Sequence, residues 1–131
     1  MEEKNYLFKI LIAEDDTISQ ILLVQYLQDT GFSVAVAKTG YEVIDIYQKE
    51  KIDLILMVVR MPDLDGFSTV GMIRNHEKNT GKHVPVIAVT AFAIHGDREK
   101  CINAGMDDYI TKPVNLDELS GIIAKWLVIR D

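Results

Sequence analysis

The sequence predicts an α/β domain in which helices cover both faces of a parallel sheet. Short apolar runs alternate with amphipathic stretches along the whole chain, the pattern of repeated strand–helix units. The third run, at residues 53–59, is almost continuously apolar, which indicates a strand buried on both faces. The length of 131 residues and the 48% of apolar residues suit one domain with one core.

Five strands are expected in chain order, each from a short apolar run. They cover residues 9–13, 33–37, 53–59, 86–89 and 109–110. Each strand is followed by a helical pattern, and right-handed crossovers join parallel strands of one sheet. Five such units in about 130 residues favour the doubly wound, flavodoxin-like strand order 2-1-3-4-5.

The helices are predicted from apolar residues at helical spacing. On the first helix, Ile18, Ile21, Leu22 and Tyr26 form one apolar face, and Gly31 is the expected C-terminal stop. The other four helices are marked by Val43, Ile44 and Tyr47, by Phe67, Val70 and Ile73, by Ile94, Cys101 and Ile102, and by Leu116, Leu119, Ile123, Trp126 and Leu127.

Composition excludes several classes of function. A net charge of −6 leaves no excess of Lys and Arg to neutralise phosphates, so we expect no nucleic-acid partner. The single cysteine, Cys101, forms no intramolecular disulfide and fits a reducing cytoplasmic setting. No apolar run approaches the ~20 residues of a membrane span, and the N-terminal sequence MEEK is too acidic for a signal peptide. The last helical pattern ends near residue 128, so we expect no output domain.

Polar residues follow three of the predicted strands. Glu14, Asp15 and Asp16 follow the first, Thr90 closes the fourth and Lys112 follows the fifth. Ligands of doubly wound sheets bind at the carboxyl ends of the strands, so these side chains should converge. The carboxylates suit Mg²⁺, and a hydroxyl and a lysine can bind phosphoryl oxygens. Alternatively, each of these polar residues has only a local structural role. For Asp16 we expect such a role, as the N-cap of the helix that follows.

With these motifs in place, the chain resembles a response-regulator receiver domain between residues 9 and 127. The segments that carry the resemblance are ILIAEDD at 10–16, MPDLDG at 61–66, VTA at 89–91, AGMDDY at 104–109 and TKP at 111–113. The sequence GDREKC at 96–101 resembles receivers that are fused to hybrid sensor kinases. The motif set is specific, and it covers nearly the whole chain.

The resemblance implies a role for individual residues. The metal-binding acids would be Glu14 and Asp15, with the backbone carbonyl of Arg60 as a third ligand. The switch residues that respond to a phosphoryl group would be Thr90, Lys112 and Tyr109. The resemblance also favours a cis peptide bond between Lys112 and Pro113.

Val58 is the departure from the family pattern. It stands where the family has its phospho-accepting aspartate, and valine has no nucleophilic atom. The neighbours Met57 and Val59 are no better, and Asp63 or Asp65 could accept a phosphoryl group only after a rearrangement. The valine is either natural, which makes the chain a pseudo-receiver, or an introduced substitution that silences a conventional receiver. The otherwise intact motif set favours a recent or deliberate change.

The expected function is therefore a receiver module of a two-component phosphorelay that cannot accept phosphate at Val58. It would work as a phosphorylation-independent or silenced signalling module, as a monomer or weak dimer, and not as an enzyme. Its partner would be a histidine kinase, a phosphotransfer protein or another signalling protein, and Mg²⁺ binding would be weakened. The alternative is a flavin-type small-ligand module on the same fold, although three acids after the first strand would repel an FMN phosphate. We expect no organic cofactor.

Overall fold

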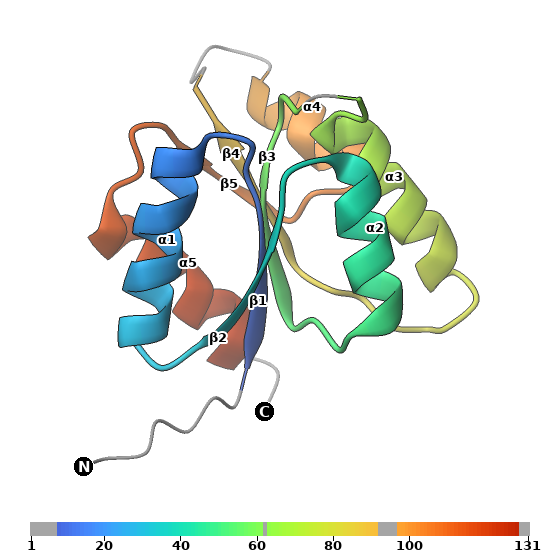
Figure 1. Cartoon of the computed structure of the whole chain (residues 1–131). Helices are drawn as coiled ribbons and strands as arrows, with labels where there is room; N and C mark the ends of the chain where they lie inside the picture. The colour runs from blue at the N-terminus through green and yellow to red at the C-terminus, as the bar shows by residue number, and fades with distance from the viewer. Residues whose placement is uncertain (1–7, 62, 92–96, 129–131) are drawn as a thin grey trace.

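The computed structural model describes residues 8–61, 63–91 and 97–128, and these contain five parallel strands in the predicted order β2-β1-β3-β4-β5 (Figure 1). The strands are β1 (Lys9–Ala13), β2 (Ser33–Ala37), β3 (Leu54–Val58), β4 (Val86–Thr90) and β5 (Asp108–Thr111). The helices are α1 (Thr17–Asp29), α2 (Gly40–Lys49), α3 (Gly66–Glu77), α4 (Asp97–Ala104) and α5 (Leu116–Val128). The doubly wound fold predicted from the sequence is confirmed.

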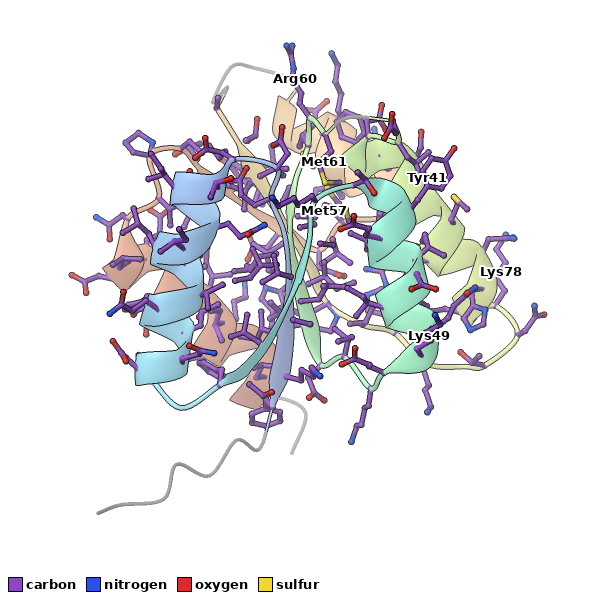
Figure 2. The ribbon with its side chains drawn as sticks, viewed as in Figure 1. Tyr41, Lys49, Met57, Arg60, Met61 and Lys78 are labelled. Atoms are coloured by element: carbon purple, nitrogen blue, oxygen red, sulfur yellow. The ribbon has the colours of Figure 1, made fainter. Side chains whose placement is uncertain are left out.

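The helices form two layers around the sheet. Helices α1 and α5 cover one face, and α2, α3 and α4 cover the other (Figure 1). Alternate residues of each strand feed the two cores, so that Leu56 and Val58 of β3 face the first layer while Met57 faces the second. Figure 2 shows Met57 inside the second layer and Arg60 projecting outward beyond the end of β3. Every residue of β3 is buried, as its continuous apolar run predicted.

The register of the sheet brings the strand ends together. Ala13 pairs with Met57, Val58 pairs with Val89, and Thr90 pairs with Thr111. The polar segments that follow β1, β3, β4 and β5 therefore leave the sheet at one common edge. This edge is where a ligand site was expected.

The apolar face predicted for α1 is wrong. Ile18, Ile21 and Leu22 are 70%, 57% and 64% exposed, whereas the buried residues of the helix are Leu23 and Leu27. Helix α1 carries apolar side chains around most of its circumference, so two different stripes satisfy helical spacing. Spacing does not decide which stripe meets the sheet. The remaining residue of the predicted face, Tyr26, is half-buried and its hydroxyl donates to the Leu116 carbonyl at 3.2 Å.

The other helices largely follow the predicted pattern. Val43, Val70, Ile73, Cys101, Leu119, Ile123 and Leu127 are buried, and Trp126 packs partly buried against the core. Ile102 and Leu116, each 43% exposed, lie outside the core, and Ile94 lies outside the described residues. Gly31 follows α1 with φ of 101°, a left-handed conformation that glycine adopts without strain.

Arg74 of α3 links this helix to the segments just before β4 and β5, at the edge of the sheet where the strands begin. Its guanidinium donates to the Gly105 carbonyl at 2.9 Å, the Val84 carbonyl at 2.8 Å, Glu77 at 2.7 Å and Asp107 at 2.7 Å. Glu77 and Asp107 are themselves largely buried, with side chains 5% and 13% exposed. Arg74 is therefore the counter-charge that makes burial of two carboxylates tolerable.

Candidate functional site

The loop after β1 places its three acids in three different environments. Glu14 is 1% exposed, whereas Asp15 and Asp16 are exposed. Glu14 Oε2 accepts a hydrogen bond from the Asp16 amide at 3.0 Å. Asp16 caps α1, as predicted, and accepts from the Ser19 amide at 2.8 Å, a bond that lowers the pKa of the Asp16 carboxyl. Glu14 and Asp15 are therefore the two acids left for a ligand.

Val58 ends β3 at the centre of the common edge and is only 4% exposed. Its side chain belongs to the apolar core beneath α1 and α5. The turn that follows is tightly held, because the Gly66 amide donates to the Val59 carbonyl at 2.8 Å. A Cβ atom at Gly66 would lie 2.7 Å from the Val58 carbonyl oxygen, so only glycine allows this approach.

The two acids considered as substitute acceptors lie in this turn. Asp65 is the N-cap of α3, and its carboxylate accepts from the Ser68 amide at 2.8 Å. Asp63 is exposed and has φ of 68°. Capping holds Asp65 in place at the start of α3, which supports the view that phosphorylation there would need a rearrangement.

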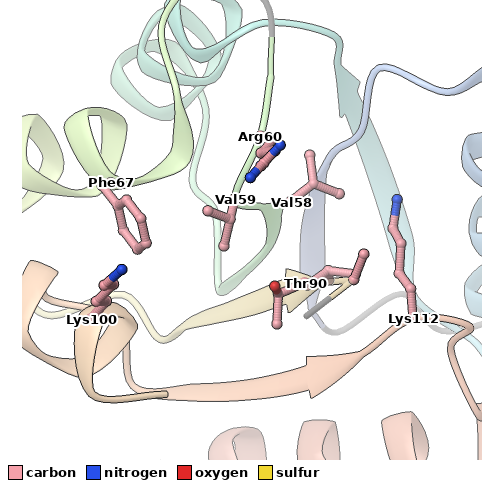
Figure 3. A pocket seen from close by; sticks show the side chains of 9 residues that line it. Val58, Val59, Arg60, Phe67, Thr90, Lys100 and Lys112 are labelled. Carbon is pink, nitrogen blue, oxygen red and sulfur yellow. The ribbon is translucent and has the colours of Figure 1, made fainter. Parts of the chain in front are cut away.

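Lys112 turns toward the buried acid, as the loss of a carboxylate at position 58 would favour. Its ammonium lies 2.9 Å from Glu14 Oε1, and its side chain is 32% exposed. The amide of Lys112 donates to the Thr90 carbonyl at 2.8 Å, which fixes the backbone beside the site. Figure 3 shows Lys112 extending along one side of Thr90, away from Lys100 on the other. The Lys112–Pro113 bond is cis, as the resemblance suggested.

Three further residues were given roles by the resemblance: Thr90, Tyr109 and Arg60. Thr90 ends β4 and is 4% exposed, and Tyr109 lies on β5, half-buried against the core beneath α2, α3 and α4. The Arg98 guanidinium lies 5.8 Å from the centroid of the Tyr109 ring, within reach of a cation–π contact. Arg60 is exposed beyond β3. The structure thus brings Glu14, Val58, Thr90 and Lys112 to one edge.

The oxygen ligands that could hold Mg²⁺ at this edge are two carboxylates, those of Glu14 and Asp15. Glu14 is buried, and its Oε1 lies 2.9 Å from the Lys112 ammonium, so a cation bound here would share this carboxylate with Lys112. Asp15 is the adjacent acid. The described part of the chain contains no group of three His, Cys, Asp or Glu side chains able to hold a metal ion. With valine at position 58, two carboxylates are what remains for a hard cation that prefers oxygen ligands.

Sequence reasoning missed two residues that line the cavity at this edge. Phe67 comes from the first turn of α3 and Lys100 from α4, and both border the cavity that Val58 and Thr90 also line (Figure 3). Phe67 was expected only as a core residue of its helix. Lys100 lies in the segment GDREKC, which carried the resemblance to hybrid-kinase receivers but gave Lys100 no role, because its place at the cavity depends on how α4 packs against the sheet.

The fold and this site together define a receiver-like signalling module. The family model of the response regulator receiver domain matches residues 10–124, and the chain belongs to this family. Among curated proteins, hybrid signal transduction histidine kinase I of Dictyostelium discoideum is 45% identical over 112 residues, which cover 82% of this chain. The sensor histidine kinase GacS of Pseudomonas protegens is 33% identical over 119 residues, or 90% of this chain.

This chain spans a small part of those kinases, 6% of the Dictyostelium protein and 13% of GacS. Solved receiver structures match over almost their whole length. The receiver domain of Ssk1 from Saccharomyces cerevisiae, crystallised with the histidine phosphotransfer protein Ypd1, gives a TM-score of 0.90 at 32% identity, covering 98% of this chain and 94% of that one. The receiver domain of sensor histidine kinase PA1611 from Pseudomonas aeruginosa gives 0.83 at 38% identity, covering 92% and 97%.

The PA1611 receiver domain has a magnesium ion coordinated in its active-site cleft, so at least one similar receiver binds this metal. The comparisons give no support to a flavin-type module. In the described residues, no helix has both the length and the apolar character needed to cross a membrane.

Proposed function

We propose that this chain is a single receiver domain, with its core at residues 9–128, that takes part in a phosphorelay without accepting phosphate at the usual position. The observation that carries the proposal is Val58, an apolar, buried side chain at the centre of an otherwise complete set of receiver residues. Acyl-phosphate formation needs a carboxylate there, and valine supplies none. The module is therefore phosphorylation-independent or silenced.

The remaining polar residues keep reduced roles in this proposal. Glu14, Asp15 and the Arg60 carbonyl hold Mg²⁺ weakly, and the ion supplies positive charge for phosphoryl oxygens when it binds. Thr90, Lys112 and Tyr109 are the residues that would respond to a phosphoryl group. In the absence of a phosphoryl group, the positive charge of Lys112 is paired with the Glu14 carboxylate at 2.9 Å. This ion pair supports the view that Lys112 needs no phosphoryl group as a partner.

The partner that we propose is a histidine kinase or a phosphotransfer protein. Of these two, we favour a phosphotransfer protein of the kind crystallised with Ssk1. Helix α1 exposes Ile18, Ile21 and Leu22, and Leu22 also lines a groove of about 560 Å³. The groove is lined mainly by apolar side chains, among them Leu22, Leu23, Pro113, Val114 and Leu116. Adjacent exposed apolar side chains of this kind mark an interaction surface.

This surface also adjoins the site, since Glu14 and Lys112 line the same groove. A partner seated on α1 would therefore contact the ion pair that these two residues form. The proposed module works in the cytoplasm, the reducing compartment that suits its single, buried cysteine, as a monomer or weak dimer.

The experiment is a calorimetric titration with Ypd1 as the probe partner. We expect binding that is unchanged by acetyl phosphate and Mg²⁺, and a loss of about tenfold or more for Ile21→Asp, which puts a charge into an apolar contact. Met72→Asp is the matched control, because Met72 is also exposed, at 45%, but lies on α3. Equal affinity of Ile21→Asp and the parent would refute the surface, and absence of binding would refute the partner class.

A further inference from the structure

A cluster of four ionisable side chains lies at the edge of the sheet where the strands begin, opposite the candidate functional site. Glu77 of α3 and Asp107, just before β5, have side chains only 5% and 13% exposed. The Arg74 guanidinium donates to both carboxylates at 2.7 Å. The fourth member is His83, in the loop before β4, whose Nε2 lies 2.7 Å from Asp107 Oδ1. The His83 side chain is 56% exposed, so it can exchange a proton with solvent.

The charges of this cluster do not balance when His83 is neutral. Two carboxylates face one guanidinium, so one negative charge has no counter-charge within the cluster. Both carboxylates are largely buried, where charges interact more strongly than in water. A proton on His83 would supply the missing positive charge, and histidine is the side chain that ordinarily changes charge between about pH 5 and 8.

The geometry indicates which nitrogen would take that proton. The Asp107 carboxylate only accepts hydrogen bonds, so neutral His83 carries its hydrogen on Nε2. A second proton, taken from water, therefore binds Nδ1, which lies 3.9 Å from Glu77 Oε1. The same two carboxylates hold the backbone at the start of β4. Glu77 accepts from the Val84 amide at 2.6 Å, and Asp107 accepts from the Val86 amide at 2.8 Å.

The other charged and titratable groups around His83 leave this imbalance in place. Those that line the same cavity, of about 500 Å³, are Tyr47, Glu50, Lys51, Asp53, His76 and Lys82. Two of them are carboxylates and two are lysines, so their formal charges cancel. Burial and the nearby Glu77 carboxylate raise the pKa of the Tyr47 phenol, so Tyr47 stays neutral where histidine titrates. His76 packs edge-on against the Tyr47 ring, with centroids 5.6 Å apart.

We propose that His83 is a proton-dependent clamp between the loops that precede β4 and β5. With a hydrogen on each ring nitrogen, the imidazolium pairs with Asp107, faces Glu77 and neutralises the cluster. When Nδ1 returns its proton to water, only a neutral donor to Asp107 remains, and the two loops separate more easily. The folded protein therefore binds this proton more tightly than the unfolded chain does, so the clamp stabilises the fold at low pH and weakens as pH rises.

The clamp acts on the part of the fold that carries a residue of the candidate site. Asp107 lies between α4 and β5, and β5 contains Tyr109. Protonation of His83 would thus fix the segment that joins α4 to β5. This response requires no phosphoryl group, Mg²⁺ or partner, so it is independent of the proposed signalling function.

The test compares urea unfolding of the parent, His83→Gln and His76→Gln at about pH 5.5 and about pH 8, on either side of the range in which histidine titrates. Glutamine keeps a neutral donor for Asp107 and has no charge at either pH. His83→Gln should raise the ratio of unfolded to folded protein about three- to tenfold at the lower pH, because a partly exposed, charged hydrogen bond is lost there, and less than about twofold at the higher pH. His76→Gln, which removes a histidine from the same cavity, should change the ratio less than about twofold at both.

An NMR measurement reports on the clamp directly. The amides of Val84 and Val86, which donate to the two carboxylates, should shift between these pH values in the parent and stay nearly unchanged in His83→Gln. Asp107→Asn removes one of the two negative charges, so the pH-dependent shift of the Val84 amide should become smaller. An equal effect of His83→Gln on stability at both pH values would leave His83 only a structural hydrogen bond and overturn the clamp. A larger effect at the higher pH, or amide shifts that persist in His83→Gln, would overturn it as well.

Discussion

Replacing Val58 by aspartate should destabilise the domain in metal-free buffer, even though it restores the family's acceptor. Val58 is 4% exposed, and burying a valine side chain contributes about 1.5–3 kcal/mol. An aspartate there would lose water and face the carboxylate of Glu14, itself 1% exposed, so its charged form would be disfavoured. Lys112 would recover part of this cost by turning from Glu14 toward the new carboxylate. We expect a net loss of about 1–2 kcal/mol, the usual scale of single substitutions.

Urea unfolding of the two proteins, with EDTA and again with excess Mg²⁺, measures this difference. Mg²⁺ should narrow it, because a cation that binds the folded aspartate form stabilises that form by mass action. Val84→Asp is the control. Val84 is also buried, at 5%, but lies near the opposite edge of the sheet, so its loss of stability should not respond to Mg²⁺. An aspartate form as stable as the parent in EDTA would refute the electrostatic reasoning.

Two other predictions follow from the same charges. Mg²⁺ should bind the parent more weakly than Val58→Asp by about tenfold or more in a titration, because one anionic oxygen ligand is missing; equal affinities would contradict the ligand assignment. Arg74→Met should lower the free energy of unfolding by about 3–5 kcal/mol, since it leaves the Glu77 and Asp107 carboxylates buried without their counter-charge. A loss below about 1 kcal/mol would show that water or His83 replaces the guanidinium.

The fold was predictable because each strand is a short apolar run. The strict alternation of five strands and helices, with right-handed crossovers, then favours one strand order. Helix α1 shows where such reasoning ends. Its apolar residues form two stripes, and the sheet selects Leu23 and Leu27, while Ile18, Ile21 and Leu22 stay exposed. Packing energy against the sheet decides this choice, and helical spacing alone carries no information about it.

The candidate site was predictable to the extent that it consists of strand ends. The register of a parallel sheet brings Glu14, Val58, Thr90 and Lys112 together, and the turn of Lys112 toward Glu14 followed from pairing of opposite charges. Lys100 could not be found in this way. It enters the cavity from α4, whose position against the sheet is a tertiary property that no local motif encodes. The hydrogen bonds from Arg74 to the Gly105 and Val84 carbonyls, just before β5 and β4, also depend on tertiary packing and could not be predicted from a local motif.

Intact-mass spectrometry after incubation with acetyl phosphate and Mg²⁺ tests most directly whether this receiver lacks a phospho-acceptor. The parent protein should keep its mass, and Val58→Asp, treated in the same way, should gain one labile phosphoryl group. The aspartate variant is the positive control for the reagent and for the integrity of the remaining site. A labile adduct of one phosphoryl group on the parent would contradict the account, and mapping it to Asp63 or Asp65 would identify the substitute acceptor.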